Sequence, residues 1–252
     1  MCATDRRTMT IREIVAADCR TATVLERHGI DFCCHGDRTL EDGCRDAGVD
    51  ATEILRELEA VTSTQGDGGP RFDAWDLDTL VAYIVANHHA YVRQQLPVLV
   101  AHTQKIATVH AARHPELARV AHLLQEIADE MTSHMAKEEQ VLFPYIVALV
   151  VAVTDRLPAP SAPFGTITNP IHRMEAEHES AGRAMIEIRE LTAGFVRPGD
   201  ACETYAVSLR ELEAFERDLH AHVHLENNIL FPKAAALEAA SRQRLAIASK
   251  SL

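Results

Sequence analysis

Two stretches of the chain share one pattern of residues. Residues 134–144 read HMAKEEQVLFP, and residues 222–232 read HVHLENNILFP. Both follow the order His-x-x-x-Glu-x-x-x-Leu-Phe-Pro. An earlier histidine precedes each copy at nearly the same interval, at position 89 or 88 for the first copy and at 178 for the second. This internal repeat predicts two copies of one helix pair.

The spacing inside each copy points to metal binding. In a helix, residues four apart lie one above the other on the same face. His134 and Glu138 can therefore hold one ion together, and so can His222 and Glu226. A single such pair occurs often by chance, but two copies in register with a shared Leu-Phe-Pro ending are specific.

Helical periodicity dominates the second part of the chain. We find no run of alternating apolar and polar residues that indicates a sheet, and the connections are of modest length. The pattern predicts an all-α protein with an up-down four-helix bundle. Pro144 and Pro232 are expected to end or bend their helices. The four long helical segments are expected near 76–101, 115–149, 170–194 and 201–231.

A small helical domain is expected before the bundle. Thr10 can cap a first helix, and Asp50 can cap a later one that runs to about Ala60. The stretch TSTQGDGGPR is rich in small and polar residues, with Gly and Pro, as linkers are. We therefore predict a helical domain over 1–62, a linker over 63–72 and the bundle over 73–252.

Histidines and glutamates interrupt the apolar stripes of the bundle helices, where burial of an unpaired carboxylate costs several kcal/mol, roughly. A cation explains several such residues at once. Mixed imidazole and carboxylate ligation with open positions favours iron over a structural zinc site. We predict two irons bridged by both glutamates and by an oxo or hydroxo group. The predicted ligands are His134, Glu138, His178, His222 and Glu226, with His88 or His89, of which the repeat spacing favours His89.

Other titratable residues near these positions have weaker assignments. Glu130 lies one turn before His134, and Glu177 adjoins His178, so either carboxylate can support a ligand or line an ion path. Ordinary surface charge explains both equally well. The remaining histidines of the bundle lie off the stripes or in loops and are expected at the surface: His102, His110, His114, His122, His172, His220 and His224.

The adjacent thiols Cys33 and Cys34 form the second unusual feature. Beside His35 they can act as a redox or iron-binding pair, because a neighbouring imidazolium lowers a thiol pKa. Adjacent cysteines also pack as small hydrophobic side chains. The spacing leaves both interpretations open.

Composition excludes several classes of function. The chain has 252 residues, with 37 acidic against 25 basic side chains and a formal net charge of −12. Such a charge repels phosphate backbones, so we expect no nucleic-acid partner. No apolar run is long enough for a membrane span, and the first residues lack the apolar region of a secretion signal. We expect a cytoplasmic protein whose cysteines are thiols or metal ligands.

The motifs together resemble those of the Repair of Iron Centers family, which are hemerythrin-like di-iron proteins with an amino-terminal cysteine pair. The resemblance covers nearly the whole chain. It implies that the iron ligands are His89, His134, Glu138, His178, His222 and Glu226. It also maps the cysteine pair to Cys33 and Cys34, and places Glu130 and Glu177 near the iron site. The matching stretches are GIDFCCHG (29–36), HHAYVRQQLP (88–97), SHMAKEEQVLFP (133–144), MEAEH (174–178) and HVHLENNILFP (222–232).

The resemblance implies protection against nitric oxide and oxidative stress through repair of damaged iron–sulfur proteins, which are the expected partners. Our leading hypothesis is that the bundle supplies iron, with Cys33 and Cys34 as redox or iron-transfer thiols. Two alternatives stay open: an enzyme that binds and reduces nitric oxide, and a protein that binds or senses dioxygen. A homodimer is compatible with either of these functions. Enzymatic activity is therefore undecided at this stage.

Overall fold

The computed structural model describes the backbone of residues 6–63 and 70–250, and side chains through residue 243. Residues 64–69 of the predicted linker and the first five residues lie outside the described part. The described residues form helices and contain no β-strand; one isolated antiparallel bridge joins Thr10 and Thr39. The prediction of an all-α protein is confirmed. None of the helices in the described ranges is both long and apolar enough to cross a membrane.

The chain divides into two compact units. Unit 1 comprises Met1–Leu80 and His220–Ala236, and unit 2 comprises Val81–Leu219 and Leu237–Leu252. The division cuts an uninterrupted helical run made of α10 (Glu203–Leu225), a π-helical turn (Glu226–Leu230) and α11 (Phe231–Lys250). The predicted limits 1–62, 63–72 and 73–252 follow the sequence rather than this division and stay a prediction.

Capping residues fix ends of two amino-terminal helices of unit 1. The Thr10 hydroxyl accepts a hydrogen bond from the Glu13 N–H, and the Glu13 side chain accepts one from the Thr10 N–H, so both unpaired donors are satisfied. Gly48 ends its helix with φ of 69°, which a residue without Cβ adopts easily. The four helices are α1 (Ile11–Ala17), α2 (Thr21–Arg27), α3 (Leu40–Ala47) and α4 (Ala51–Ser63).

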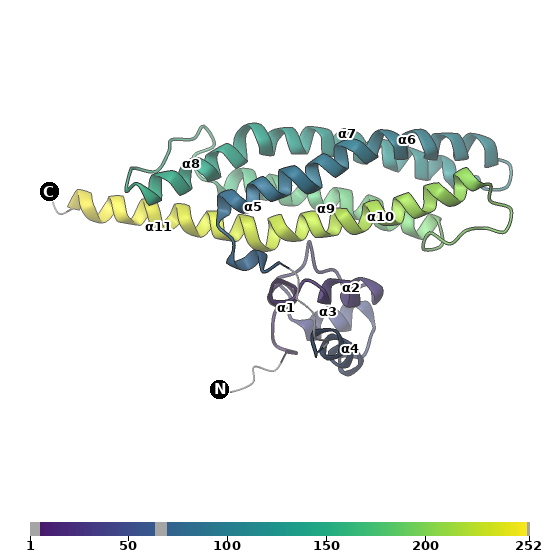
Figure 1. Ribbon diagram of the computed structural model, residues 1–252, viewed down its shortest axis with the longest axis horizontal. Helices are drawn as coiled ribbons and strands as arrows, with labels where there is room; N and C mark the ends of the chain where they lie inside the picture. The colour runs from purple at the N-terminus through teal and green to yellow at the C-terminus, as the bar shows by residue number, and fades with distance from the viewer. Residues whose placement is uncertain (1–5, 64–69, 251–252) are drawn as a thin grey trace. The chain divides into compact units, whose positions relative to one another are not determined.

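Four long helices lie side by side in the bundle (Figure 1): α6 (Ala90–His110), α7 (Leu117–Lys137), α9 (Thr168–Leu191) and α10. Polar contacts inside unit 2 join neighbouring helices. Arg119 of α7 bonds Glu187 of α9 at 2.7 Å, and His102 of α6 lies 2.7 Å from Glu211 of α10. Short connections make consecutive helices antiparallel, which confirms the predicted up-down order.

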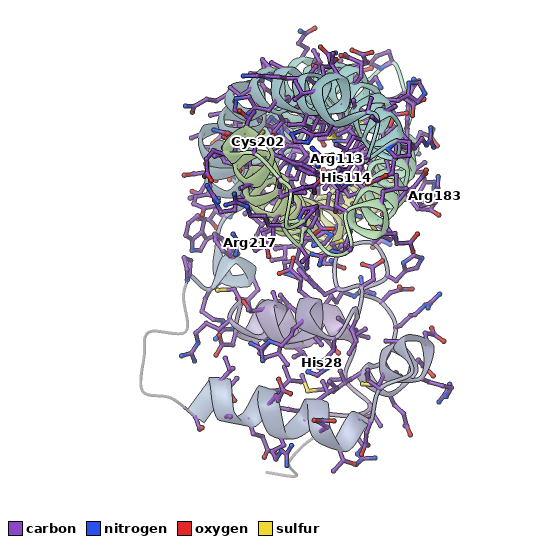
Figure 2. The ribbon with its side chains drawn as sticks, turned by 90° about the vertical axis from the view of Figure 1, so that its right-hand side faces the viewer. His28, Arg113, His114, Arg183, Cys202 and Arg217 are labelled. Atoms are coloured by element: carbon purple, nitrogen blue, oxygen red, sulfur yellow. The ribbon has the colours of Figure 1, made fainter. Side chains whose placement is uncertain are left out.

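Two connections meet at one end of unit 2 (Figure 2). His114 follows α6 and lies 3.0 Å from Asp200, which precedes α10. At the end of α6, His110 Nε2 lies 3.2 Å from the Sγ of Cys202, an exposed cysteine that, like Asp200, precedes α10. These contacts fix the α6–α7 and α9–α10 loops to one another.

The helices continue through both prolines of the repeat. A π-helical turn precedes each one, over Glu138–Leu142 before α8 (Phe143–Thr154) and over Glu226–Leu230 before α11. The N–H of Phe143 donates to the carbonyl of Glu138, and that of Phe231 to the carbonyl of Glu226. A proline lacks an N–H and crowds the preceding turn, which a wider turn accommodates. The expected helix end at 231 is therefore wrong, since the run reaches Lys250.

A third π-helical turn, Val85–His89, joins α5 (Leu77–Ile84) to α6. Each of the three turns begins or ends at one of the predicted metal ligands, namely His89, Glu138 and Glu226. Such turns are rare and occur mostly at functional sites, because one extra residue redirects the side chains next to it.

Candidate metal centre

The six predicted ligands are all buried in the structure. Their exposed fractions are 0% for His89, His134, Glu138, His222 and Glu226, and 1% for His178. Two carboxylates and four imidazoles in an apolar interior need compensating charge, because an ionised carboxylate loses its hydration there.

Inside unit 2, the ring nitrogens converge on one carboxylate. Nε2 of His134 lies 2.9 Å from Nε2 of His178 and 3.3 Å from Oε2 of Glu138. Nε2 of His89 lies 3.3 Å from the same oxygen. Ligand bonds of about 2.1 Å at right angles put neighbouring ligand atoms about 3.0 Å apart. These contacts have the spacing of atoms that share a metal ion.

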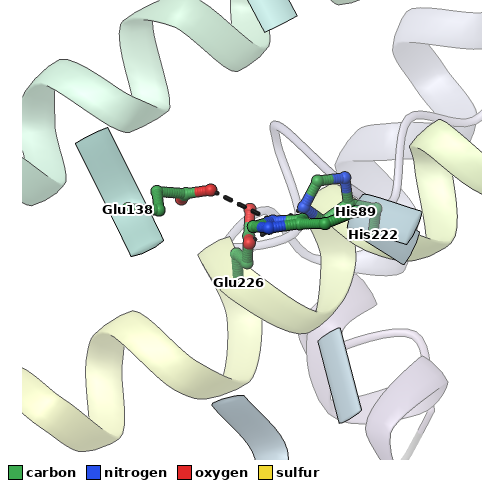
Figure 3. Close-up of side chains that lie close together, drawn as sticks. All are labelled: His89, Glu138, His222 and Glu226. Atoms are coloured by element: carbon green, nitrogen blue, oxygen red, sulfur yellow. Dashed lines mark hydrogen bonds and ion pairs between the residues drawn. The ribbon is translucent and has the colours of Figure 1, made fainter. Parts of the chain in front are cut away.

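In the second copy of the repeat, the histidine and glutamate four residues apart are also in contact. Nε2 of His222 lies 2.9 Å from Oε1 of Glu226. Two sets of four residues offer ligand atoms that all lie within 4.8 Å of one another. Figure 3 shows the side chains of the first set pointing toward each other. Glu138 and Glu226 belong to both sets. The first set is His89, Glu138, His222 and Glu226, and the second is His134, Glu138, His178 and Glu226.

Carboxylates outside the cluster orient two of the imidazoles. Nδ1 of His89 lies 2.6 Å from Oε1 of Glu139, and Nδ1 of His134 lies 3.0 Å from Oε2 of Glu177. A carboxylate only accepts hydrogen bonds, so each Nδ1 carries the proton and donates. Each Nε2 is then left with the lone pair that binds a metal.

Both orienting carboxylates are charged. Burial raises the pKa of Glu177, but hydrogen bonds from Lys137, His134 and Arg173 outweigh this effect and lower it. Burial raises the pKa of Glu139 likewise, while hydrogen bonds from Arg93 and His89 lower it below its usual range.

The structure places the three carboxylates near these positions differently. Glu177 lies against His134, one of the clustered histidines. Glu130 is exposed and lies 3.5 Å from the hydroxyl of Ser180, outside both sets. Glu139 was missed, although it directly follows Glu138 in the repeat and has no acidic counterpart in the second copy, where Asn227 stands.

Comparison with known proteins agrees with this geometry. The hemerythrin HHE cation binding domain matches residues 80–234, and a domain of unknown function named ScdA_N matches residues 7–62. The iron-sulfur cluster repair protein YtfE of Yersinia pestis (strain Pestoides F) is 32% identical over 231 residues, covering 91% of this chain and 98% of that protein. The same values hold for YtfE of Yersinia pseudotuberculosis serotype O:1b (strain IP 31758).

The chain belongs to the Repair of Iron Centers family. Its hemerythrin-type domain is a non-haem iron-binding domain, and the His and Glu clusters lie within the matched residues. The family resemblance that the motifs carried is confirmed.

The adjacent residues His88 and His89 have different neighbours. His88 is also buried, but its Nδ1 lies 3.0 Å from Oδ1 of Asp218, and it belongs to neither set. His89 instead faces Glu138. Of the two, the structure places His89, which the repeat spacing favours, beside Glu138.

Two of the histidines expected at the surface are buried, so that prediction is wrong for them. His110 is 6% exposed and contacts Cys202, while His224 is 5% exposed and packs against the ring of Phe32 at 5.9 Å. Burial lowers the pKa of His224 to about 4, so this imidazole is neutral.

The cysteine pair of the family lies in a loop of unit 1. Cys33 is 7% exposed and Cys34 is half-buried, with their sulfurs 3.7 Å apart. Nδ1 of His35 lies 2.6 Å from Oδ2 of Asp31. The hydrogen bond with Cys34 and burial raise the pKa of Cys33 well above its usual range. The predicted lowering by a neighbouring imidazolium is therefore wrong for Cys33.

Proposed function

We propose that this protein repairs iron–sulfur clusters damaged by nitric oxide or oxidative stress by supplying iron from the bundle. The observation that carries the proposal is the convergence of His89 and His134 on one buried carboxylate oxygen of Glu138. The names of the relatives point to the same activity. Damaged iron–sulfur proteins are the proposed partners, and the cytoplasm is the proposed location.

The donor set fits two iron ions. Each set of four residues supplies two imidazoles and two carboxylates, and Glu138 and Glu226 would bridge the ions. Imidazole and carboxylate ligands suit iron, and the absence of sulfur from these two sets disfavours softer ions. When bound, iron is the cargo that a damaged cluster needs.

The protein side chains set how tightly this cargo is held. The carboxylates attract ferric iron more strongly than ferrous iron because of its higher charge, and the neutral imidazoles add no negative charge, so ferrous iron is bound more weakly than ferric iron. Reduction would therefore loosen the site. We propose that Cys33 and Cys34 serve this step, as reductants or as the next ligands for released iron.

Iron transfer can be tested with a cluster enzyme damaged by nitric oxide. Iron-loaded wild-type protein is expected to restore its activity faster than an equal amount of free ferrous salt. His134→Ala is expected to lose this advantage. His172→Ala, which removes an exposed histidine from α9, is the matched control and should act like wild type. Equal recovery with ferrous salt, wild type and His134→Ala would exclude iron donation.

Reduction of nitric oxide to nitrous oxide is a second candidate function. The two sets share both carboxylates, which would hold two ions side by side and bring two nitric oxide molecules close together. The reaction consumes two electrons and two protons for each pair and releases water. Nitrous oxide release over many turnovers with an electron donor would support this function, and its absence would exclude it.

A further inference from the structure

A second group of metal-binding side chains lies in the cysteine loop of unit 1, outside the bundle cluster. Asp31, Cys33 and Cys34 offer a carboxylate oxygen and two sulfurs that all lie within 4.8 Å of one another. Cys33 is buried, whereas Asp31 is exposed and Cys34 half-buried. The group therefore has one side packed in the protein and one side open to solvent.

The carboxylate of Asp31 organises this loop. Its Oδ1 accepts hydrogen bonds from the N–H of Cys33 at 3.0 Å and of Cys34 at 2.9 Å, and lies 3.3 Å from the Sγ of Cys33. Its Oδ2 lies 2.6 Å from Nδ1 of His35. An aspartate held on both oxygens has one orientation, as metal-binding carboxylates commonly do.

Contacts elsewhere in unit 1 hold the backbone of the same loop. The amide of Asn228 donates to the carbonyls of Phe32 and Cys33, at 3.1 Å each. A Cβ at Gly36 would lie 2.9 Å from the Phe32 carbonyl and 2.5 Å from the Asn228 side chain, so no larger residue fits without movement. The ligand atoms are thus placed before any ion arrives.

The distances match those of a four-coordinate metal ion. Two thiolates at about 2.3 Å from one ion in tetrahedral geometry lie about 3.8 Å apart. The sulfurs of Cys33 and Cys34 are 3.7 Å apart, and the Cys33 sulfur is 3.3 Å from Asp31 Oδ1. Thiolates exclude hard ions such as Mg²⁺ and Ca²⁺ and select zinc or ferrous iron.

We propose that Asp31, Cys33 and Cys34 form a second, sulfur-rich site for a divalent transition-metal ion. Three ligands come from the protein, and the fourth position faces solvent, so the ion can exchange. Binding breaks two S–H bonds, forms two metal–sulfur bonds and releases two protons to the buffer, with no change of oxidation state. The site stands by itself; only its use as a stop for iron leaving the bundle rests on the proposed function.

Co²⁺ added to the full chain tests the site, because thiolate-to-cobalt absorption in the near ultraviolet arises only from sulfur ligands. The bundle sets contain no sulfur, so cobalt bound there is silent in this band. Wild type is expected to develop the band, with the intensity of one sulfur-bound cobalt ion per chain. Cys34→Ser should halve its intensity, and the Cys33→Ser/Cys34→Ser double variant should abolish it.

Asp31→Asn tests the carboxylate without removing the turn, because an amide oxygen still accepts the N–H bonds of Cys33 and Cys34. We expect cobalt affinity at the thiolate band to fall roughly tenfold or more. Cys202→Ser, which removes an exposed thiol of unit 2, is the matched control and should leave the band unchanged. Far-ultraviolet circular dichroism and the melting temperature of each variant report folding separately.

Three results would overturn the site: no thiolate band in wild type, loss of the band in Cys202→Ser, or unchanged affinity in Asp31→Asn. Iron content of the bundle and recovery of a damaged cluster enzyme are measured on the same variants. If cobalt binds as expected but recovery fails even in wild type, the proposed function falls and the site stands. If recovery succeeds without a thiolate band, the site falls alone.

Discussion

Nε2 of His134 lies 2.9 Å from Nε2 of His178, and the opposite nitrogen of the His134 ring lies 3.0 Å from the carboxylate of Glu177. Two imidazole nitrogens at this distance either share one proton or share one ion. Because Glu177 holds the proton of His134 on Nδ1, the lone pair on Nε2 faces His178. The Glu177–His134 contact therefore leaves Nε2 of His134 as the acceptor that can bind an ion, or take a proton from His178 when no ion is bound.

The first prediction concerns this orienting carboxylate. Glu177→Gln keeps the shape of the side chain, but it removes the charge that fixes the His134 tautomer. We expect about 10- to 100-fold weaker metal binding, the usual effect of losing such a contact. Competition with a chromogenic chelator measures the affinity. Glu179→Gln, on the exposed side of the same helix, is the control, and an equal effect in both variants would contradict the prediction.

The second prediction separates the two ligand sets. His178 belongs to one set only, whereas Glu138 belongs to both. His178→Ala is expected to retain one tightly bound iron and to lose the other, while Glu138→Ala is expected to lose both. Iron per chain after desalting gives the result. A single iron in wild type, or identical iron loss in both variants, would rule out a shared pair of bridging carboxylates.

The third prediction concerns stability without metal. Glu138 is fully buried among histidines, so its charge opposes folding when no cation is bound. Metal-free Glu138→Met is expected to be as stable as the metal-free wild type, or more stable by about 1–4 kcal/mol. Added metal at a thousandfold excess over its Kd should raise only wild-type stability, by about 4 kcal/mol.

Urea unfolding with and without ferrous or zinc ion measures both effects. The important result is a reversal in relative stability: Glu138→Met is at least as stable as wild type without metal, and wild type is the more stable protein with metal. If metal-free Glu138→Met is strongly destabilised, the carboxylate has a structural role that does not depend on an ion.

One physical rule governs most of the predicted cluster. Side chains four apart share a helix face, and a buried histidine or glutamate breaks an apolar stripe visibly. The choice between His88 and His89 was harder, since the stripe allows both. The π-helical turn at Val85–His89 changes the direction of these side chains, and ordinary helical periodicity does not include such a turn.

Residues whose partners come from distant segments were missed for a different reason. Glu139 contacts His89 across 50 positions, and His224 packs against the ring of Phe32 from the loop between α2 and α3. No local pattern encodes such pairs. The surface prediction for His110 failed likewise, since its contact with Cys202 depends on two loops meeting at one end of the helices.

The last prediction concerns pH and the buried Glu238 of α11. Its carboxylate accepts hydrogen bonds from the hydroxyls of Tyr145, at 2.6 Å, and Thr166, at 2.8 Å, and from the N–H of Ile167, at 3.2 Å. Burial raises the pKa of Glu238, but these bonds outweigh it, so the pKa lies below its usual value of 4.5. Burial and the bond to Glu238 raise the pKa of Tyr145 to about 12.

A lowered carboxylate pKa stabilises the fold above the unfolded-state pKa, and this contribution is lost as pH falls through the folded-state pKa. Glu238→Gln is therefore expected to cost about 1.5–3 kcal/mol at pH 7, because it loses charge-assisted bonds. The difference from wild type should shrink steadily below pH 4.5. Urea unfolding across this range measures it, with the exposed Glu213→Gln as control. A difference that is independent of pH would mean that side-chain shape, rather than the charge on Glu238, holds these segments together.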